Sequence, residues 1–466
     1  MVKKNDIYIG EVIDFGSNGE GIIKREDLVV FIPFSIIGET VKYKVLKTEK
    51  NIAYGKIVEI IKPSPLRVAP ECAVFGRCGG CDLQHVDYEK TLDIKRENVR
   101  RCFEKIANLP VEPQETVRSD MIFGYRNKLQ LPVGTENGET VIGFYARNSH
   151  RIVSISSCPI NPSWTETVIN VFKDYLNFSG VKPFDQVCET GEIKEITVKE
   201  IGVALIITVV SVKDTLKNAD YLIEKLKEKF SVFSLYLNLN TANNNVIYGE
   251  KFILLYGEKD YECEVNGVKI RSGVQSFSQV NDNVCAKLYE TAVSLATKDS
   301  PDSIVDAYSG AGLMTAMLAK KCNNVYGIEI VKEAVNCADE VAKSNGLLSK
   351  MTNICGKTEE VLPKMIAEKK IIGNFNVVLD PPRKGCEYEV LDAINKSGAK
   401  RVVYISCMPS TLARDVGILT GTLVKGGKGL IKAENPSGAF KMERVIPFDM
   451  FPQTKHVETV CLLKKV

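Results

Sequence analysis

Short runs in which apolar and polar residues alternate fill the first 60 positions of the chain. Alternation with a period of two is typical of strands that are buried on one face only. Turn signals at residues 16–19 and 37–39 help to separate five such runs, namely IYIGEVID, EGIIK, LVVFIP, TVKYKVLKT and IAYGKIVEII. These runs predict a small closed OB-like β-barrel, of the kind that often binds oligonucleotides, over residues 1–60. The fold alone does not establish RNA binding.

The pattern changes twice along the rest of the chain. A helix is expected around residues 94–109. Strand-like runs then dominate from Tyr125 to about Cys263, with helical spacing at 163–176 and 214–229. We therefore expect an α+β middle domain over residues 61–275. From about residue 284 onward strands and helices alternate, which predicts a parallel sheet covered by helices on both faces, in a Rossmann-like domain over residues 276–466. With 466 residues the chain is too long for one hydrophobic core, so the fold class is multidomain α/β.

Composition and charge add two limits to this picture. The 44% apolar and 26% charged residues are ordinary for a globular protein, and no run approaches the roughly 18 apolar residues that span a bilayer. The first residues, MVKKNDIYIGEVID, contain no apolar signal core, so we expect a cytoplasmic monomer with no membrane partner. A net charge of +3 says little about partners, and nucleic-acid binding has to be argued from motifs.

A glycine turn in the run SIVDAYSGAGLMTAMLA predicts a ligand site at a strand end. Gly310 and Gly312 follow a short apolar strand and let the backbone approach a ligand. The next strand ends in Glu329, at the position where α/β domains bind ribose hydroxyls. Thr315 stands where a pyrophosphate-binding turn would have its third glycine. The spacing favours S-adenosylmethionine, with a nicotinamide cofactor as the alternative.

Two further strands, FNVVLD and RVVYIS, end in Asp380 and directly before Cys407, and Glu458 precedes the last apolar strand. Carbon 5 of uracil becomes nucleophilic only after a thiolate adds to carbon 6, and a base must later remove the carbon 5 proton. Cys407 and Glu458 supply a thiol and a carboxylate for these two roles. The alternative is that Cys407 is a buried core thiol, as isolated cysteines often are.

The chain has fourteen cysteines, and three of them form a C-x5-C-x2-C cluster at Cys72, Cys78 and Cys81. Cys158 is the best candidate for a fourth ligand, and His85 could compete with it. Close-set thiols bind zinc or an iron–sulfur cluster, and the spacing alone leaves both open. Other cysteines lie singly in apolar surroundings and are expected to be small buried hydrophobes, namely Cys188, Cys285, Cys322 and Cys337.

Basic and aromatic residues of the middle domain are candidates for RNA contact. A set of cations would bind the RNA backbone, comprising Arg126, Lys128, Arg147, His150 and Arg151. Tyr125 and Phe144 are available for stacking on bases. The alternative is a solvated sheet face with the two aromatic residues in the core.

Several motifs together resemble the RNA (uracil-5-)-methyltransferase family over nearly the whole chain. They are DPPRKG, YISCMPSTLARD, DMFPQTKHVE, FSQVN at 277–281, the cysteine run at 72–85 and YRNK at 125–128. The predicted barrel, as a TRAM domain, and the cysteine cluster most resemble the bacterial 23S ribosomal RNA branch. The resemblance implies that Cys407 is the nucleophile and Glu458 the proton acceptor. It also implies adenosylmethionine contacts from Gln279, Tyr308, Glu329 and Asp380, and a [4Fe–4S] cluster on Cys72, Cys78, Cys81 and Cys158.

Two residues depart from the family pattern, and three rival functions stay open. Met408 replaces the usual Asn after the nucleophile, and Lys357 replaces an acidic residue near the adenine. A cytosine-5 RNA methyltransferase also uses a thiol adduct, but its proline-containing loop carries a second Cys that Asp380-Pro381-Pro382 lacks. The transfer-RNA branch of the family and a non-catalytic RNA-binding iron–sulfur protein are the other two.

Overall fold

The computed structural model describes residues 2–186, 188–276, 278–427 and 429–466. The chain folds into two compact units, and each is built from several separate segments. The first unit contains Met1–Ile94, Met121–Glu258 and Phe451–Lys455, and the second contains Lys95–Asp120, Lys259–Met450 and His456–Val466. The division expected at residues 60 and 275 stays a prediction.

The first unit begins with a six-stranded sheet in the order β1-β5-β6-β4-β3-β2. Its strands are β1 Ile7–Glu11, β2 Asp14–Phe15, β3 Gly21–Arg25, β4 Leu28–Ile32, β5 Thr40–Thr48 and β6 Ile52–Lys62. Each of the five alternating runs of the sequence overlaps one of these strands, and the first run also includes Asp14, the first residue of β2. The inward residues form a small core that includes Val30, Ile32, Val41 and Tyr43. Closure of this sheet into a barrel stays a prediction.

The rest of the first unit is a seven-stranded sheet with two helices, in the order β13-β12-β11-β10-β7-β8-β9. The strands are β7 Lys128–Glu136, β8 Glu139–Tyr145, β9 Ile152–Ser154, β10 Ile193–Ile201, β11 Ala204–Ser211, β12 Phe233–Leu239 and β13 Lys251–Tyr256, and the helices are α2 Trp164–Ser179 and α3 Ala219–Lys227. Alternate residues of every strand except β9 pack in one core with α2 and α3, so these helices cover one face of the sheet. This confirms the predicted α+β character.

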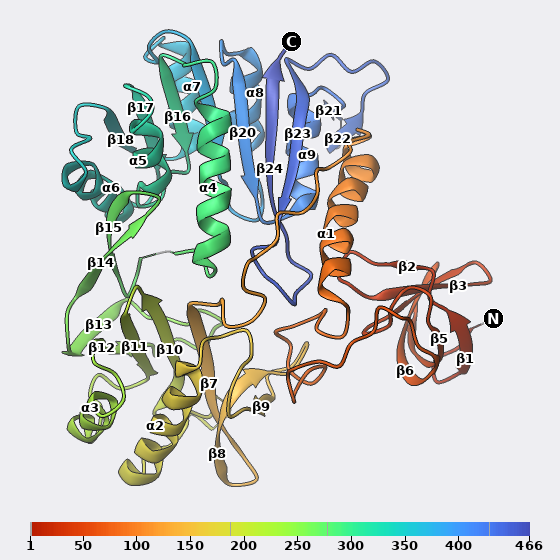
Figure 1. Cartoon of the computed structure of the whole chain (residues 1–466), viewed down its shortest axis with the longest axis vertical. Helices are drawn as coiled ribbons and strands as arrows, with labels where there is room; N and C mark the ends of the chain where they lie inside the picture. The colour runs from red at the N-terminus through yellow and green to blue at the C-terminus, as the bar shows by residue number, and fades with distance from the viewer. Residues whose placement is uncertain (1, 187, 277, 428) are drawn as a thin grey trace. The chain divides into compact units, whose positions relative to one another are not determined.

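The second unit contains the predicted parallel sheet, in the order β18-β17-β16-β19-β20-β24-β23 (Figure 1). Its strands are β16 Ser303–Ala307, β17 Val325–Glu329, β18 Met351–Cys355, β19 Phe375–Leu379, β20 Arg401–Ser406, β23 Phe440–Phe448 and β24 Glu458–Lys465. The first five are parallel, and β24 runs antiparallel to both β20 and β23. The strand order reverses between β16 and β19, and ligands of open α/β sheets bind at this switch point.

Helices cover both faces of this sheet. One layer consists of α4 Asp282–Ala296, α5 Leu313–Ala319 and α6 Lys332–Ser344, and the other consists of α7 Thr358–Ala367, α8 Tyr388–Lys396, α9 Pro409–Leu419 and the π-helix η1 Phe103–Ala107. η1 continues α1, Tyr88–Cys102. Two hairpins complete the unit, β14 Asp260–Val265 with β15 Val268–Gly273, and β21 Leu423–Gly426 with β22 Gly429–Lys432.

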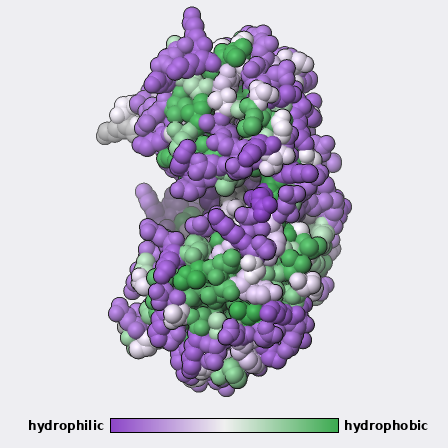
Figure 2. Space-filling view, turned by 90° about the vertical axis from the view of Figure 1, so that its left-hand side faces the viewer, coloured by the Kyte–Doolittle hydropathy of each residue, from purple (hydrophilic) through white to green (hydrophobic). Residues whose placement is uncertain are grey.

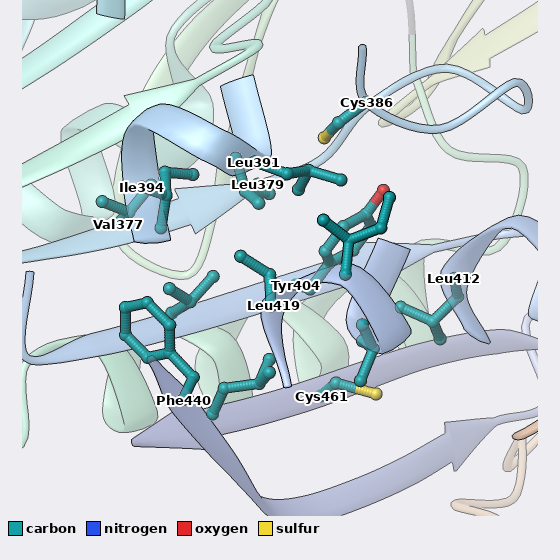
Figure 3. Packing of buried hydrophobic residues seen from close by; sticks show 14 of the residues in the cluster. Val377, Leu379, Cys386, Leu391, Ile394, Tyr404, Leu412, Leu419, Phe440 and Cys461 are labelled. Atoms are coloured by element: carbon teal, nitrogen blue, oxygen red, sulfur yellow. The ribbon is translucent and has the colours of Figure 1, made fainter. Parts of the chain in front are cut away.

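The main core of the second unit lies between the sheet and the α7–α9 layer. Figure 3 shows strand residues such as Val377 and Leu379 packed against Leu391, Ile394 and Leu419 of the helices. This core fixes the strand ends, and therefore the residues that follow them.

The surface is mostly hydrophilic on the face that Figure 2 displays, with apolar residues gathered in separate patches. None of the helices in the described part of the chain combines the length and the apolarity that a membrane crossing requires.

Candidate active site

The turn after β16 provides an open approach for a ligand. Tyr308 has a φ of 81°, a left-handed conformation that non-glycine residues adopt mostly where function requires it. At Gly310, with a φ of 53°, an added Cβ would meet nothing within 4 Å. At Gly312 an added Cβ would lie 2.6 Å from the Cβ of Ala338. Gly310 therefore leaves space for a ligand, whereas Gly312 permits close packing between α5 and α6.

Glu329 at the end of β17 is held beside this turn. Its carboxylate accepts hydrogen bonds from the backbone N–H groups of Gly310, at 3.1 Å, and Val331, at 2.8 Å. Thr315 has a role that the sequence did not reveal, because its hydroxyl donates to the buried carboxylate of Asp306 at 2.6 Å. Burial raises the pKa of Asp306 to about 6, against the effect of this hydrogen bond. The turn thus presents a fixed carboxylate and exposed backbone, which fits an adenosine ribose.

Cys407 and Glu458 come from neighbouring antiparallel strands. The β20–β24 ladder ends with Ser406 paired to Thr459, so Cys407, the residue after Ser406, and Glu458, the residue before Thr459, lie next to this last pair. The two side chains interact electrostatically. Asp380 follows β19, the other neighbour of β20. Three of the predicted site residues therefore meet at one edge of the sheet, beside the switch point.

Burial raises the pKa values of the acids at this edge of the sheet. Burial, followed by repulsion from Asp380, raises the pKa of Glu458 to about 8, although Arg383 opposes the shift. Burial and Asp306 raise the pKa of Asp380 to about 7. The pKa of the Cys407 thiol is also raised, first by burial and then by Glu458, while Arg383 lowers it through its charge and a hydrogen bond. Shifted pKa values of this kind cluster at functional sites.

Arg383 and Tyr289 belong to this site but were assigned no role from the sequence. Arg383 is the one cation that moderates the pKa values of both Cys407 and Glu458 among the interactions of the described residues. The sequence could have pointed to Arg383, because this residue stands three positions after Asp380 in the motif DPPRKG. The phenol of Tyr289, on α4, hydrogen-bonds Gln279 and interacts with Asp380 and Glu458, and burial raises its pKa well above the usual range. Helical spacing had given no reason to single it out.

A hydrogen-bonded clamp fixes the loop that carries Arg383. The buried Asp415 carboxylate accepts the Cys386 N–H at 2.8 Å, the Tyr404 hydroxyl at 2.6 Å and the Arg414 Nε at 2.7 Å. Arg414 Nη2 donates to the Lys384 carbonyl at 2.8 Å. Figure 3 shows Tyr404 in the strand layer and Cys386 on the neighbouring loop. Helix α9, which begins just after Cys407, therefore holds the far end of the Asp380 loop.

The four predicted cluster cysteines lie near one another in the first unit. The thiols of Cys72, Cys78 and Cys158 all interact electrostatically with Cys81, and burial raises the pKa of Cys81 to about 12. Backbone N–H groups point at two of the sulfurs, from Gly80 to Cys78 at 3.3 Å and from Ile160 and Asn161 to Cys158. Among the described residues, no three or more Cys, His, Asp or Glu side chains are grouped as the ligands of one metal ion would be.

His85 lies in an aromatic environment instead. Its ring packs 5.8 Å from Phe34 and 5.5 Å from Phe75, and burial lowers its pKa to about 4. Its electrostatic neighbours are Arg67, Glu39 and Asp82 rather than thiols.

Other sequence predictions are partly corrected. Tyr125 is buried, with its hydroxyl on the Pro452 carbonyl at 3.0 Å, and Phe144 packs on the helix-covered core, so neither is free to stack on a base. Cys285 and Cys322 are buried as expected, but Cys188 and Cys337 are exposed. Cys337 precedes the core residue Ala338 on α6 and so faces away from the core. Phe277, the first residue of the FSQVN motif, lies outside the described residues.

The chain matches known proteins over its whole length. A profile of the family described as tRNA (Uracil-5-)-methyltransferase matches residues 87–466. An uncharacterized RNA methyltransferase of Clostridium tetani is 36% identical over 466 residues, covering 99% of this chain and 97% of the relative. One from Staphylococcus epidermidis is 36% identical over 469 residues, covering 99% and 98%.

A solved structure matches with a TM-score of 0.76 and 24% identity, covering 98% of this chain and 99% of its own. It is the Pyrococcus abyssi tRNA (uracil-54, C5)-methyltransferase in complex with S-adenosyl-L-homocysteine. At this identity the similarity establishes the fold alone.

Proposed function

The chain belongs to the tRNA (uracil-5-)-methyltransferase family of S-adenosylmethionine-dependent RNA-modifying enzymes, and we propose that it methylates carbon 5 of a uridine through a covalent adduct with Cys407. The observation that carries this proposal is that Cys407 and Glu458 lie next to the last pair of the β20–β24 ladder and interact electrostatically. Asp380 and Arg383 act on both groups. A thiol and a carboxylate of shifted pKa are the two groups that uracil C5 methylation requires from the protein.

The first step forms the adduct. The thiolate of Cys407 attacks carbon 6 of the uracil, a sulfur–carbon bond forms, and the electrons of the C5=C6 bond move onto the enolate. Burial disfavours the thiolate, and the adjacent Arg383 guanidinium offsets part of this effect. The methyl donor supplies an electrophilic carbon and keeps the bonding electrons on its sulfur, while carbon 5 forms the new carbon–carbon bond.

The second step releases the product. Glu458 accepts the proton from carbon 5, the C5=C6 bond forms again, and the bond to the Cys407 sulfur breaks with its electrons returning to the thiolate. A carboxylate with a pKa of about 8 is a stronger base than an ordinary glutamate once it is ionised. Gln279, Tyr308, Gly310, Glu329 and Asp380 are proposed to hold the methyl donor, since Glu329 and the open space at Gly310 fit its adenosine part.

For the RNA target we propose 23S ribosomal RNA, because the N-terminal strands and the cysteine cluster resemble that branch of the family. Transfer RNA is the second candidate. The Pyrococcus abyssi structure covers 98% of this chain, so an N-terminal extension of this extent also occurs in a protein that acts on tRNA. Unmodified transcripts of 23S rRNA fragments and of tRNA, incubated separately with radiolabelled methyl donor, distinguish the two. Methyl transfer to neither transcript would contradict the proposal as a whole.

We further propose that Cys72, Cys78, Cys81 and Cys158 hold a [4Fe–4S] cluster. Two features support this assignment. The four thiols lie within electrostatic range of each other, and backbone N–H groups donate to the sulfurs, as is usual where thiolates bind a cluster. A role in shaping the fold of the middle segment is expected, because methyl transfer needs no electron.

A further inference from the structure

Glu195 of β10 lies on the face of the seven-stranded sheet that does not carry α2 and α3. Its neighbours along the strand, Ile196 and Val198, pack in the helix-covered core, and Glu195 and Thr197 alternate with them. The side chain of Glu195 therefore belongs to the other face, where its cross-strand neighbours are the apolar residues Pro132 and Val210.

One oxygen of the Glu195 carboxylate lacks a hydrogen-bond donor. This atom, Oε2, is buried, and no donor contacts it among the described residues. The charge of the adjacent Lys194 lowers the pKa of Glu195, but the Nζ of Lys194 donates its hydrogen bond to the Ala242 carbonyl at 2.7 Å and lies 5.1 Å from the ring centroid of Phe184. Burial raises the pKa of Glu195 to about 7. An unpaired buried carboxylate costs stability, so its presence calls for a compensating use.

Two tyrosines border this carboxylate. The hydroxyls of Tyr145, at the end of β8, and Tyr248, before β13, both interact electrostatically with Glu195. The Tyr248 hydroxyl is held by Thr197 Oγ1 at 2.6 Å. Tyr145 is 40% exposed, and its ring meets the edge of His150 at 5.8 Å. The face thus combines a hydrogen-bond acceptor, two phenols and an accessible aromatic surface.

These properties match an unstacked nucleobase. Base edges offer N–H donors beside carbonyl acceptors, and single-stranded RNA is recognised by stacking on aromatic side chains together with hydrogen bonds to these edges. Lys128, on the same face of β7, adds a cation for the RNA backbone, and burial beside Arg126 lowers its pKa. A small anion fits poorly, because the carboxylate would repel it.

We infer that Glu195, Tyr145 and Tyr248 form a subsite that binds one unstacked base of the RNA substrate. This inference rests on the proposed function for the nature of the ligand. It concerns recognition only, since the three residues belong to the first unit and the proposed reacting groups to the second. Tyr145, one position after Phe144, takes the stacking role that the sequence had suggested for its neighbour.

The experiment combines stability with RNA binding. Glu195→Gln and Glu195→Leu should raise the thermal unfolding midpoint, because they remove the unpaired carboxylate. The same variants should weaken binding of a mixed-sequence single-stranded RNA of about 20 nucleotides by roughly tenfold or more, measured by filter retention without methyl donor. Glu192→Gln is the matched control, since it removes a carboxylate near the same strand that is already paired with Lys213 at 2.6 Å. The control should leave RNA binding unchanged.

A second measurement separates this inference from the proposed function. On a transcript that the wild type methylates, the Glu195 variants should raise the KM for RNA and leave kcat and the KM for the methyl donor unchanged. Tyr145→Phe should retain more RNA affinity than Tyr145→Ala, because it keeps the stacking surface. Stabilised Glu195 variants that bind RNA as the wild type does would overturn the inference. Failure of the wild type to methylate any transcript contradicts the proposed function, and the filter assay still tests the subsite.

Discussion

The carboxylate of Asp415 accepts the backbone N–H of Cys386 at 2.8 Å, and this bond joins helix α9 to the loop that follows Asp380. The same carboxylate binds the Tyr404 hydroxyl and the Arg414 guanidinium. Because α9 starts at Pro409, two residues after Cys407, the clamp couples the position of Cys407, the proposed nucleophile, to that of Arg383. The two loops are thus held in one arrangement before any substrate binds, which is the preorganisation that catalysis favours.

Removing this clamp should impair catalysis more than methyl-donor binding. Asp415→Ala leaves the Cys386 N–H, the Tyr404 hydroxyl and Arg414 without their shared acceptor, so we expect a loss of about 2–4 kcal/mol in unfolding free energy. We also expect kcat to fall while the Kd for S-adenosylmethionine changes little. Tyr404→Phe removes one of the three bonds and should cost only about 1 kcal/mol. Chemical denaturation and isothermal titration calorimetry measure the two quantities, and an Asp415→Ala enzyme with wild-type kcat would contradict the positioning role.

Ionisation of Glu458 should affect stability between pH 4.5 and about 8, and activity around pH 8. The folded-state pKa is about 8 and the ordinary value is 4.5, so between these values the folded protein binds a proton that the unfolded chain has released. Stability from this group is therefore lost as the pH rises from 4.5 to about 8. Product release, which needs the ionised base, should instead rise through pH 8. Glu458→Gln should remove this part of the dependence of stability on pH. The variant should therefore unfold at a higher temperature than the wild type at pH 8.

The periodic features of this fold could be predicted from sequence, and its side-chain networks could not. The strands within the first 60 residues and the parallel sheet after residue 284 are both present in the structure. Each of these elements could be predicted from the local pattern of apolar and polar residues. The positions of Cys407, Glu458 and Asp380 at the ends of strands were also predictable, since each borders an apolar run. Boundaries were less accurate, as the helix expected over 214–229 spans only Ala219–Lys227.

The clamp and the base-binding subsite depend on contacts between distant segments. Asp415 and Cys386 are 29 residues apart in the sequence, and Tyr248 and Thr197 are 51 residues apart. No local sequence pattern could therefore predict either hydrogen bond. The sequence suggested Phe144 as the stacking residue, whereas the structure favours its neighbour Tyr145, and this difference has a simpler cause. A shift of one residue in a strand reverses the face to which a side chain points.

Glu329 should contribute to the affinity for the methyl donor. Its carboxylate is held by the N–H groups of Gly310 and Val331 and presents charge to a ribose. Glu329→Gln removes that charge at constant size, and we expect the Kd for S-adenosylmethionine to rise by roughly 10–100-fold. Glu333→Gln, on the exposed first turn of α6, is the control and should bind normally. Equal affinities in calorimetry would exclude Glu329 from the donor site.

The cysteine cluster predicts the metal content of the purified protein. Anaerobically prepared protein should be brown and contain iron and sulfide at about four each per chain, as a cubane cluster requires. Cys158→Ser should lose the cluster, whereas Cys337→Ser, at an exposed cysteine of α6, should retain it. Colourless protein with one zinc ion would refute the cluster and leave the catalytic proposal intact. Full iron content in Cys158→Ser would identify a different fourth ligand.

The order of events at Cys407 and Glu458 gives the sharpest test of the mechanism. Cys407→Ala should abolish both the covalent adduct and methyl transfer, because without the thiolate carbon 5 never becomes nucleophilic. Glu458→Gln should still permit attack and methylation and then stall, with release slowed by roughly 10²–10⁴-fold. A denaturing gel with radiolabelled methyl donor separates the two outcomes, since only Glu458→Gln should show a labelled protein–RNA band. RNA with 5-fluorouridine should trap the wild type, because fluorine cannot leave as a cation. If Cys407→Ala still forms that adduct, the buried Cys386 beside the Asp380 loop becomes the first residue to test.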